Sequence, residues 1–224
     1  MTNEKAIHIY PNGNKHRLFL VVLGIFLLAI NLMLISSFWQ SAKLLLIFTS
    51  LAAFVVFISG VTKWLEPAFS FTLTPKNLTY HHRCGDYQLL WRDIKHISEL
   101  EMTVGVERQS LPYIAISLHS LNAIVDTISP RLANKLIHEQ KSLLIWCVQR
   151  YLVEMEDITM KFEPFKLQDR VITGPIAEFL HHCTTLHQAL GYHLVIPTTA
   201  LDRDTMAFSQ LLKQCQISAK KYND

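Results

Sequence analysis

Two long apolar runs near the N-terminus define the first predicted elements. Residues 18–38 and 44–61 carry no charged side chain. An α-helix of either length, at about 1.5 Å per residue, is long enough to cross roughly 30 Å of hydrocarbon. The short link between them, residues 39–43, permits only an antiparallel pair. The pattern therefore predicts a transmembrane helical hairpin within residues 18–64, preceded by a cytoplasmic tail, residues 1–17.

Alternation with a period of two replaces the apolar runs after the second span. Residues 69–74 and 78–83 each alternate apolar and polar side chains, which is typical of half-buried strands, and residues 87–91 are expected to return as the partner strand. Residues 84–86, Cys-Gly-Asp, are typical of a tight turn. Residues 111–119 alternate in the same way. The pattern predicts a meander of short antiparallel strands that includes a hairpin.

Helical periodicity dominates the second half of the chain. Ser129-Pro130 marks a helix N-terminus, because serine caps a helix and proline fits its first turn. The apolar face continues to about Leu152. Gly174-Pro175 begins a second helix, and Gly191 is placed to end it as a C-cap. A last helix begins near Asp202 or Arg203.

Short strands are predicted between these helices, at residues 160–165 and 192–196. The fold class is therefore α+β. The N-terminal transmembrane helical hairpin is followed by a cytoplasmic domain, residues 65–224, which combines an antiparallel sheet with additional helices.

The flanking charges predict the orientation of the two spans. The tail carries Lys5, Lys15 and Arg17, whereas the link carries only Lys43. Because cytoplasmic flanks are enriched in Lys and Arg, both termini are expected in the cytoplasm of a bacterium, with the chain in the inner membrane. Four widely separated cysteines also fit a reducing compartment.

Charge and polarity exclude some classes of function. The formal net charge is +3, too small to indicate a nucleic-acid partner. Neither span carries an ionisable residue, so a transporter is not expected. Asn31 in the first span needs a hydrogen-bond partner in lipid. Two interpretations remain open: a contact with another helix or protomer, or a locally satisfied side chain.

The segment "FTLTPKNLTYHHRCGDYQLLWRDIKHI", residues 71–97, is similar to the bacterial PH-like (pleckstrin-homology-like) membrane proteins, including the YcxB-like group. In those proteins a hairpin precedes a W-x-D-I box, which matches Trp91, Asp93 and Ile94 here. Residues 192–212 are similar to their closing strand, proline and C-terminal helix. The resemblance implies a PH-like sheet domain.

The chain as a whole also resembles an uncharacterised two-span family of gamma-proteobacteria without an assigned activity. The segments that carry this resemblance are "ISPRLA", "LGY" and "ALDR", at residues 128–133, 190–192 and 200–203. A simple PH-like domain passes from its strands directly to one terminal helix. Here residues 128–191 intervene, either as a helical insertion or as a separate small domain.

A histidine-rich hairpin is the first candidate for chemistry. His81, His82 and Cys84 lie within four positions. On a strand, His82 and Cys84 share one face and His81 points to the other. Two ligands do not complete a zinc site, which needs three or four. The favoured interpretation is a structural hairpin, and no metal or cofactor is expected.

A second cluster lies on the helix after Gly174. Cys183 falls on its apolar stripe, whereas His181 and His182 are expected to face solvent. Cys183 and His187 have i,i+4 spacing, so a metal site shared with the hairpin is the alternative. The chain has no G-x-S-x-G elbow and no G-x-x-x-x-G-K-[ST] phosphate loop. A non-enzyme is predicted.

The remaining candidate residues suggest contacts rather than catalysis. Trp91 is expected to plug the core, and Asp93 to cap the following turn. His81, His82, Arg83 and Arg92 are expected to gather near the hairpin tip, where they would contact lipid or a partner.

The predicted role is a membrane-anchored, non-catalytic binding or scaffold module. Besides the lipid bilayer, it would bind an unidentified protein or a second copy of itself. One alternative is recognition of anionic lipid headgroups, although two arginines fall short of the usual cluster of four to eight cations. The second alternative is a metal- or thiol-dependent enzyme.

Overall fold

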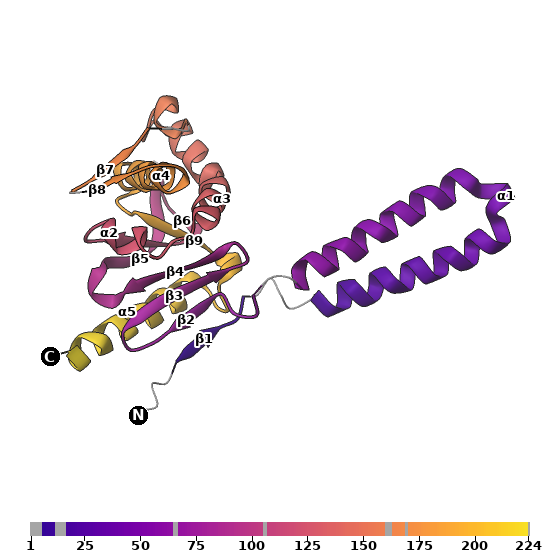
Figure 1. Cartoon of the computed structure of the whole chain (residues 1–224), viewed down its shortest axis with the longest axis horizontal. Coiled ribbons are helices and arrows are strands. Elements are labelled where there is room, and N and C mark those ends of the chain that lie inside the picture. Colours follow the sequence, from indigo (N-terminus) through magenta and orange to yellow (C-terminus); the bar gives the residue numbers. More distant parts are fainter. Residues whose placement is uncertain are drawn as a thin grey trace. The chain divides into compact units, whose positions relative to one another are not determined.

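A computed structural model shows two compact units (Figure 1). One unit comprises Met1–Tyr10 with Phe69–Asp224, and the other comprises Pro11–Ala68. The parts of the chain that the structure describes are residues 6–11, 17–64, 67–104, 107–159, 163–168 and 170–223.

The smaller unit is built on one long apolar helix, α1 (Arg17–Trp64), which is long and apolar enough to cross a membrane. Its backbone leaves the helical region at Ala42, where φ is −139° and ψ is 34°. Ala42 lies in the segment predicted to link two spans. Apolar side chains such as Met33 and Leu44 are about three-quarters exposed within this chain.

Polar and small residues on the two sides of Ala42 contact each other. Asn31 Nδ2 donates to Thr49 Oγ1 (2.5 Å), and Ser50 Oγ donates to Asn31 Oδ1 (2.6 Å). A Cβ atom added at Gly24 would lie 2.6 Å from the Cα atom of Phe57. Of the two interpretations of Asn31, the structure therefore shows a contact between segments of the same chain.

A four-stranded antiparallel sheet begins the larger unit, in the order β1-β2-β3-β4. The strands are β1 (Ile7–Ile9), β2 (Phe71–Leu73), β3 (Asn77–His82) and β4 (Gly85–Leu90). The predicted hairpin is confirmed as β3–β4. The assignment of residues 7–9 to a tail is wrong, because β1 pairs with β2 across 61 intervening sequence positions, with Ile9 opposite Phe71. Three residues are too few for a periodic signal.

A second antiparallel sheet has the order β5-β6-β9. Its strands are β5 (Ile94–Val104), β6 (Glu107–Leu118) and β9 (Leu194–Pro197). Strand β5 was not predicted, because register irregularities between Ile94 and His96 and between Glu99 and Glu101 break the alternation. A separate pair consists of β7 (Phe165–Leu167) and β8 (Arg170–Ile172). Residues 160–162 of the strand predicted at 160–165 lie outside the described residues.

Two of the predicted helices begin where the sequence predicts, whereas the last begins at Thr205, two to three residues after the predicted start near Asp202 or Arg203. Ser129 caps α3 (Pro130–Gln149), its Oγ accepting from Leu132 N (3.2 Å). Helix α3 ends before Leu152, because Tyr151 adopts a left-handed conformation (φ 58°). Gly191 ends α4 (Pro175–Leu190) with φ 81°. The other helices are α2 (Asn122–Val125), α5 (Thr205–Asn223) and the short 3-10 segments η2 (Trp91–Asp93), η3 (Met155–Ile158) and η4 (Thr198–Ala200).

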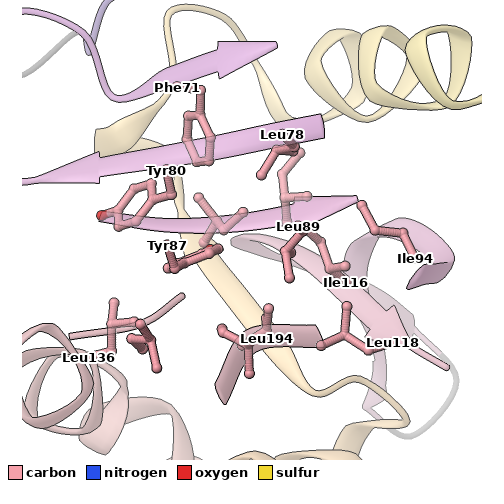
Figure 2. Close-up of a cluster of buried hydrophobic side chains, with 14 of the residues drawn as sticks. Phe71, Leu78, Tyr80, Tyr87, Leu89, Ile94, Ile116, Leu118, Leu136 and Leu194 are labelled. Carbon is pink, nitrogen blue, oxygen red and sulfur yellow. The ribbon is translucent and has the colours of Figure 1, made fainter. Parts of the chain in front are cut away.

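One buried cluster joins both sheets to the helices (Figure 2). Side chains from β2, β3 and β4 meet those of β6 and β9, and Leu136 of α3 and Phe208 of α5 belong to the same cluster. The rings of Phe71 and Phe208 lie 5.6 Å apart. Residues 128–191 are therefore part of the same compact unit as the strands, and the possibility of a separate small domain is wrong.

The W-x-D-I segment lies beside this core. Trp91 is buried and its Nε1 donates to the Thr74 carbonyl (2.8 Å), as expected for a core plug. Ile94 is also buried, and its carbonyl accepts from Gln216 Nε2 (2.6 Å). In the described part of the chain, the Asp93 carboxylate lies 3.8 Å from Arg92 Nε instead of capping a turn.

Candidate functional site

The four predicted contact residues do not gather in one place. The β3–β4 register sets His82 opposite Gly85, so Arg83 lies in the turn, whereas Arg92 follows the far end of β4. Strand β4 lies between Arg83 and Arg92 and spans about 20 Å, at roughly 3.3 Å per residue. The predicted cluster at the hairpin tip therefore lacks Arg92.

His81 belongs to a hydrogen-bonded chain across four strands. Its Nδ1 lies 3.1 Å from Asp86 Oδ2, and its Nε2 lies 3.0 Å from Thr72 Oγ1. Thr72 Oγ1 is also 3.2 Å from His8 Nδ1. The ring of Phe69 packs near both histidine rings. Because the Thr72 hydroxyl bonds two histidines, it ties β1 to β3 across the outer face of the sheet.

His82 connects the hairpin to α3. Its Nδ1 accepts from Cys84 N (3.1 Å), and its Nε2 lies 3.7 Å from Glu139 Oε1. Glu139 also pairs with Lys135 (3.2 Å). His81 and His82 are both half-buried rather than surface residues. No group of three or more His, Cys, Asp or Glu side chains with metal-binding geometry occurs among the described residues.

A cavity of about 350 Å³ lies between α3, η3 and α4. Its volume falls within the usual range of small-molecule sites. Apolar side chains and several titratable ones line it together: Ile137, His138, Lys141, Leu144, Met155, Asp157, Ile158, Thr159, Glu178, His181 and His182. Thr185 of α4 donates to the Asp157 carbonyl (3.3 Å), which ties η3 to one wall of the cavity.

His182 is buried, with 7% of its surface exposed, so the prediction that it faces solvent is wrong. Helix α4 packs on two sides: Cys183 belongs to the main core, whereas His182 lies against α3. The buried part of the surface of α4 is therefore wider than its apolar stripe. Leu186, four positions after His182, belongs to a second buried cluster with Leu143 and Leu144 of α3.

The hydrogen bonds of His182 define its protonation. Gln140 Nε2 donates to the Val195 carbonyl (2.9 Å), which orients the amide so that its Oε1 faces His182 Nε2 at 2.9 Å. An amide oxygen only accepts, so Nε2 carries the proton and Nδ1 carries a lone pair. Burial lowers the pKa of His182 to about 4, so the ring is neutral at pH 7.

Gln140 was not recognised as a site residue from the sequence. The signal was its position, since it interrupts the apolar stripe of Leu136, Leu143 and Cys147 on α3. A polar residue at a buried helical position needs a specific partner. The pairing with His182 of α4 supplies that partner, although the residues lie 42 positions apart in sequence.

The buried thiols are held in their protonated form. Burial raises the pKa of Cys147 to about 11 and raises that of Cys183 further. It also raises the pKa of the half-buried Cys215 thiol. The thiolate is the reactive species, so these three cysteines are poor nucleophiles at neutral pH.

The fold and its buried groups define an α+β protein with a long apolar N-terminal helix and a ligand-sized cavity. The chain belongs to the family described as Protein of unknown function (DUF2982), whose family model matches residues 71–218. This match covers most of the larger unit. No curated protein and no solved structure matches the chain.

Proposed function

We propose that this chain is a membrane-anchored, non-catalytic binding module. In this proposal residues 17–64 cross the bacterial inner membrane twice, both termini are cytoplasmic, and the larger unit binds a ligand in the cytoplasm. Association with a protein partner or with a second copy stays a prediction from the sequence.

The pairing of β1 with β2 is the observation that carries the proposal. These strands precede and follow the apolar segment, and Ser70 N donates to the Ile9 carbonyl (2.8 Å). Both ends of residues 11–68 are therefore held at one place in the larger unit, which favours an even number of crossings. A single straight helix of 48 residues would instead be about 72 Å long, more than twice the hydrocarbon thickness.

The contacts within α1 support two antiparallel spans. In hydrocarbon, polar groups must be satisfied within the protein, and Asn31 has partners in Thr49 and Ser50. Small residues let helices approach closely in membranes. Gly24 and Gly60 lie where an added Cβ would come within 3 Å of the opposite segment.

Several features support binding over the alternatives. The cavity has the size and mixed lining of a ligand site. The raised pKa values of the buried thiols weigh against a thiol enzyme. The separation of Arg83 from Arg92 weighs against a basic rim for lipid headgroups. The two antiparallel sheets with α5 packed against β5 and β6 support a PH-like relationship as part of this proposal.

Membrane fractionation of two chains tests the proposal. One is the full chain, and in the other a short turn replaces residues 11–68 and joins Tyr10 to Phe69. Because β1 and β2 are already antiparallel neighbours, this turn would complete a hairpin. The full chain should resist extraction by alkaline carbonate, and the shortened chain should be soluble with Trp91 still buried. Carbonate release of the full chain, or retention of the shortened chain in the membrane, would contradict the anchor.

A further inference from the structure

The cavity between α3, η3 and α4 has an apolar part that suits a compact hydrocarbon body. Ile137 and Leu144 of α3 are buried in its lining, and Met155 and Ile158 of η3 contribute further apolar side chains. The volume of about 350 Å³ has room for about ten non-hydrogen atoms, at roughly 30 Å³ each. One aromatic ring with a short substituent would therefore fill most of this space.

One nitrogen of the His182 ring is engaged outside this cavity. Nε2 donates to Gln140 Oε1 (2.9 Å), and Gln140 in turn lines a separate, much smaller pocket beside β9. The amide of Gln140 is held in this orientation by its own hydrogen bond to the Val195 carbonyl (2.9 Å). The proton of the neutral ring therefore stays on Nε2, and the lone pair stays on Nδ1.

The other ring nitrogen, Nδ1, opens toward the cavity. In the part of the chain that the structure describes, Nδ1 forms no hydrogen bond, yet it is not among the side-chain atoms sealed from solvent. His182 as a whole is buried and lines the cavity, so the space that reaches Nδ1 is the cavity. Because Nδ1 presents a lone pair, a ligand group that meets it has to be an N–H or O–H donor.

The acceptor at Nδ1 is uncharged, and this property selects among the possible donors. Burial lowers the pKa of His182 to about 4, so the ring is neutral at pH 7. A carboxylate has no proton to donate at this pH. A protonated amine has one, but a charge in a buried site is costly unless an opposite charge meets it, and a neutral imidazole supplies none.

Two acidic residues of the lining do not change this selection. Asp157 and Glu178 already interact with other groups of the chain, so no charge is assigned to the ligand from them. A hydroxyl group donates a hydrogen bond to Nδ1 without bringing a charge into the cavity.

We infer that this cavity binds a small uncharged hydroxyl compound with an apolar body, whose O–H group donates to His182 Nδ1. The hydrocarbon body packs among Ile137, Leu144 and Ile158. Phenols and short aromatic alcohols belong to this class. The inference rests on the binding role proposed above and adds the chemical class of the ligand.

Fluorine NMR titration of the full-length protein in a nonionic detergent tests the inference. The probe is 4-fluorophenol, and the matched ligand is 4-fluorotoluene, in which a methyl group of nearly the same size replaces the hydroxyl. Empty micelles give the blank for partition into detergent. The affinity for 4-fluorophenol relative to 4-fluorotoluene should fall about fivefold in His182→Leu, which corresponds to the loss of one net hydrogen bond between neutral groups.

The nitrogen NMR signal of His182 Nδ1 gives a second readout in the wild-type protein. It is assigned by its absence from His182→Leu. The signal should have the position of an unprotonated imidazole nitrogen in the free protein. It should move toward the protonated position when 4-fluorophenol binds, because Nδ1 then accepts a hydrogen bond, and it should not do so with 4-fluorotoluene.

Two tryptophan variants locate the binding. Met155 lines the cavity and is also exposed, so Met155→Trp should block both ligands by filling the mouth of the cavity. Met206→Trp is the matched control at an exposed methionine of α5, and it should block neither.

The outcomes separate the ligand class from the binding role. An affinity ratio that His182→Leu leaves unchanged, with an Nδ1 signal that 4-fluorophenol does not move, would overturn the hydroxyl inference while keeping a binding site. Tighter binding of 4-fluorobenzylamine than of 4-fluorophenol would overturn the uncharged class. The absence of saturable binding of any of these ligands would overturn both the inference and the cavity as the binding site.

Discussion

Acidification should destabilise the larger unit through His182. The unfolded chain takes up a proton on this ring near its ordinary value of 6.5, whereas burial lowers the pKa in the native state to about 4. Between these values the unfolded state binds more protons. The free energy of unfolding is therefore fully retained above pH 6.5 and falls as the pH drops toward 4. Integration over this interval gives a loss of about 3 kcal/mol from His182 alone.

Comparison with His182→Leu isolates this contribution. At pH 7 the variant should be about 1–3 kcal/mol less stable than the wild type, because Gln140 loses its partner. At pH 4 that difference should shrink by about 3 kcal/mol and vanish or change sign, because only the wild type pays for protonation. The assay is urea denaturation of the full chain in mild detergent at several pH values, followed by tryptophan fluorescence, to which the buried Trp91 contributes.

Gln140→Leu is the matched control for this experiment. It removes the same hydrogen bond but keeps the titrating ring, so its stability should fall at pH 7 and still decrease strongly toward pH 4. If the stability of His182→Leu followed that of the wild type in parallel from pH 7 to pH 4, a neutral, buried His182 would be refuted.

Two further predictions concern glycines. Gly24→Leu should destabilise the packing within α1 by about 1–3 kcal/mol, as overpacking does. Ala29→Leu, at an exposed position of the same helix, should not destabilise it. Cysteine cross-linking between the two segments of α1 measures this packing, and equal cross-linking in both variants would contradict the contact at Gly24. Gly85→Ala should cost about 1–3 kcal/mol more than Gly174→Ala. Both glycines have positive φ, but only at Gly85 would the new Cβ meet Ser129, the cap of α3. Thermal unfolding of the two variants compares them, and equal melting temperatures would refute the close contact.

Local signals predicted the elements that local interactions define. Ser129-Pro130 and Gly191 act within a few residues, through a cap and a left-handed turn, so both helix ends could be placed from the sequence. The β3–β4 hairpin was likewise predicted from Gly85, although the turn itself is at Arg83 and Cys84 and Gly85 begins β4. Trp91 could be assigned to the core because an indole ring at the end of a strand has a large apolar area that is stabilised by burial.

Long-range pairing explains what the sequence did not predict. Strand β1 exists because β2 pairs with it from beyond the apolar segment. Strand β5 is irregular, and its register is set by β6. The burial of His182 depends on α3, which supplies Gln140 as its partner. The sequence of α4 alone shows only its apolar stripe. Its second buried face contains the polar residue His182, and for that reason the sequence pattern predicted this face to be exposed to solvent.

The labelling of single cysteines in intact cells tests the two-span anchor most directly. Each of Ser41→Cys, Ala6→Cys and Lys220→Cys would be made in a chain whose four natural cysteines are replaced by alanine or serine. Ser41 lies beside the break in α1, and the other two sites are exposed in the larger unit. A membrane-impermeant maleimide should label Ser41→Cys from outside the inner membrane, and should label the other two only after the membrane is permeabilised. Protection of all three sites in intact cells would contradict the two crossings, and the reverse pattern would contradict the cytoplasmic location of the larger unit.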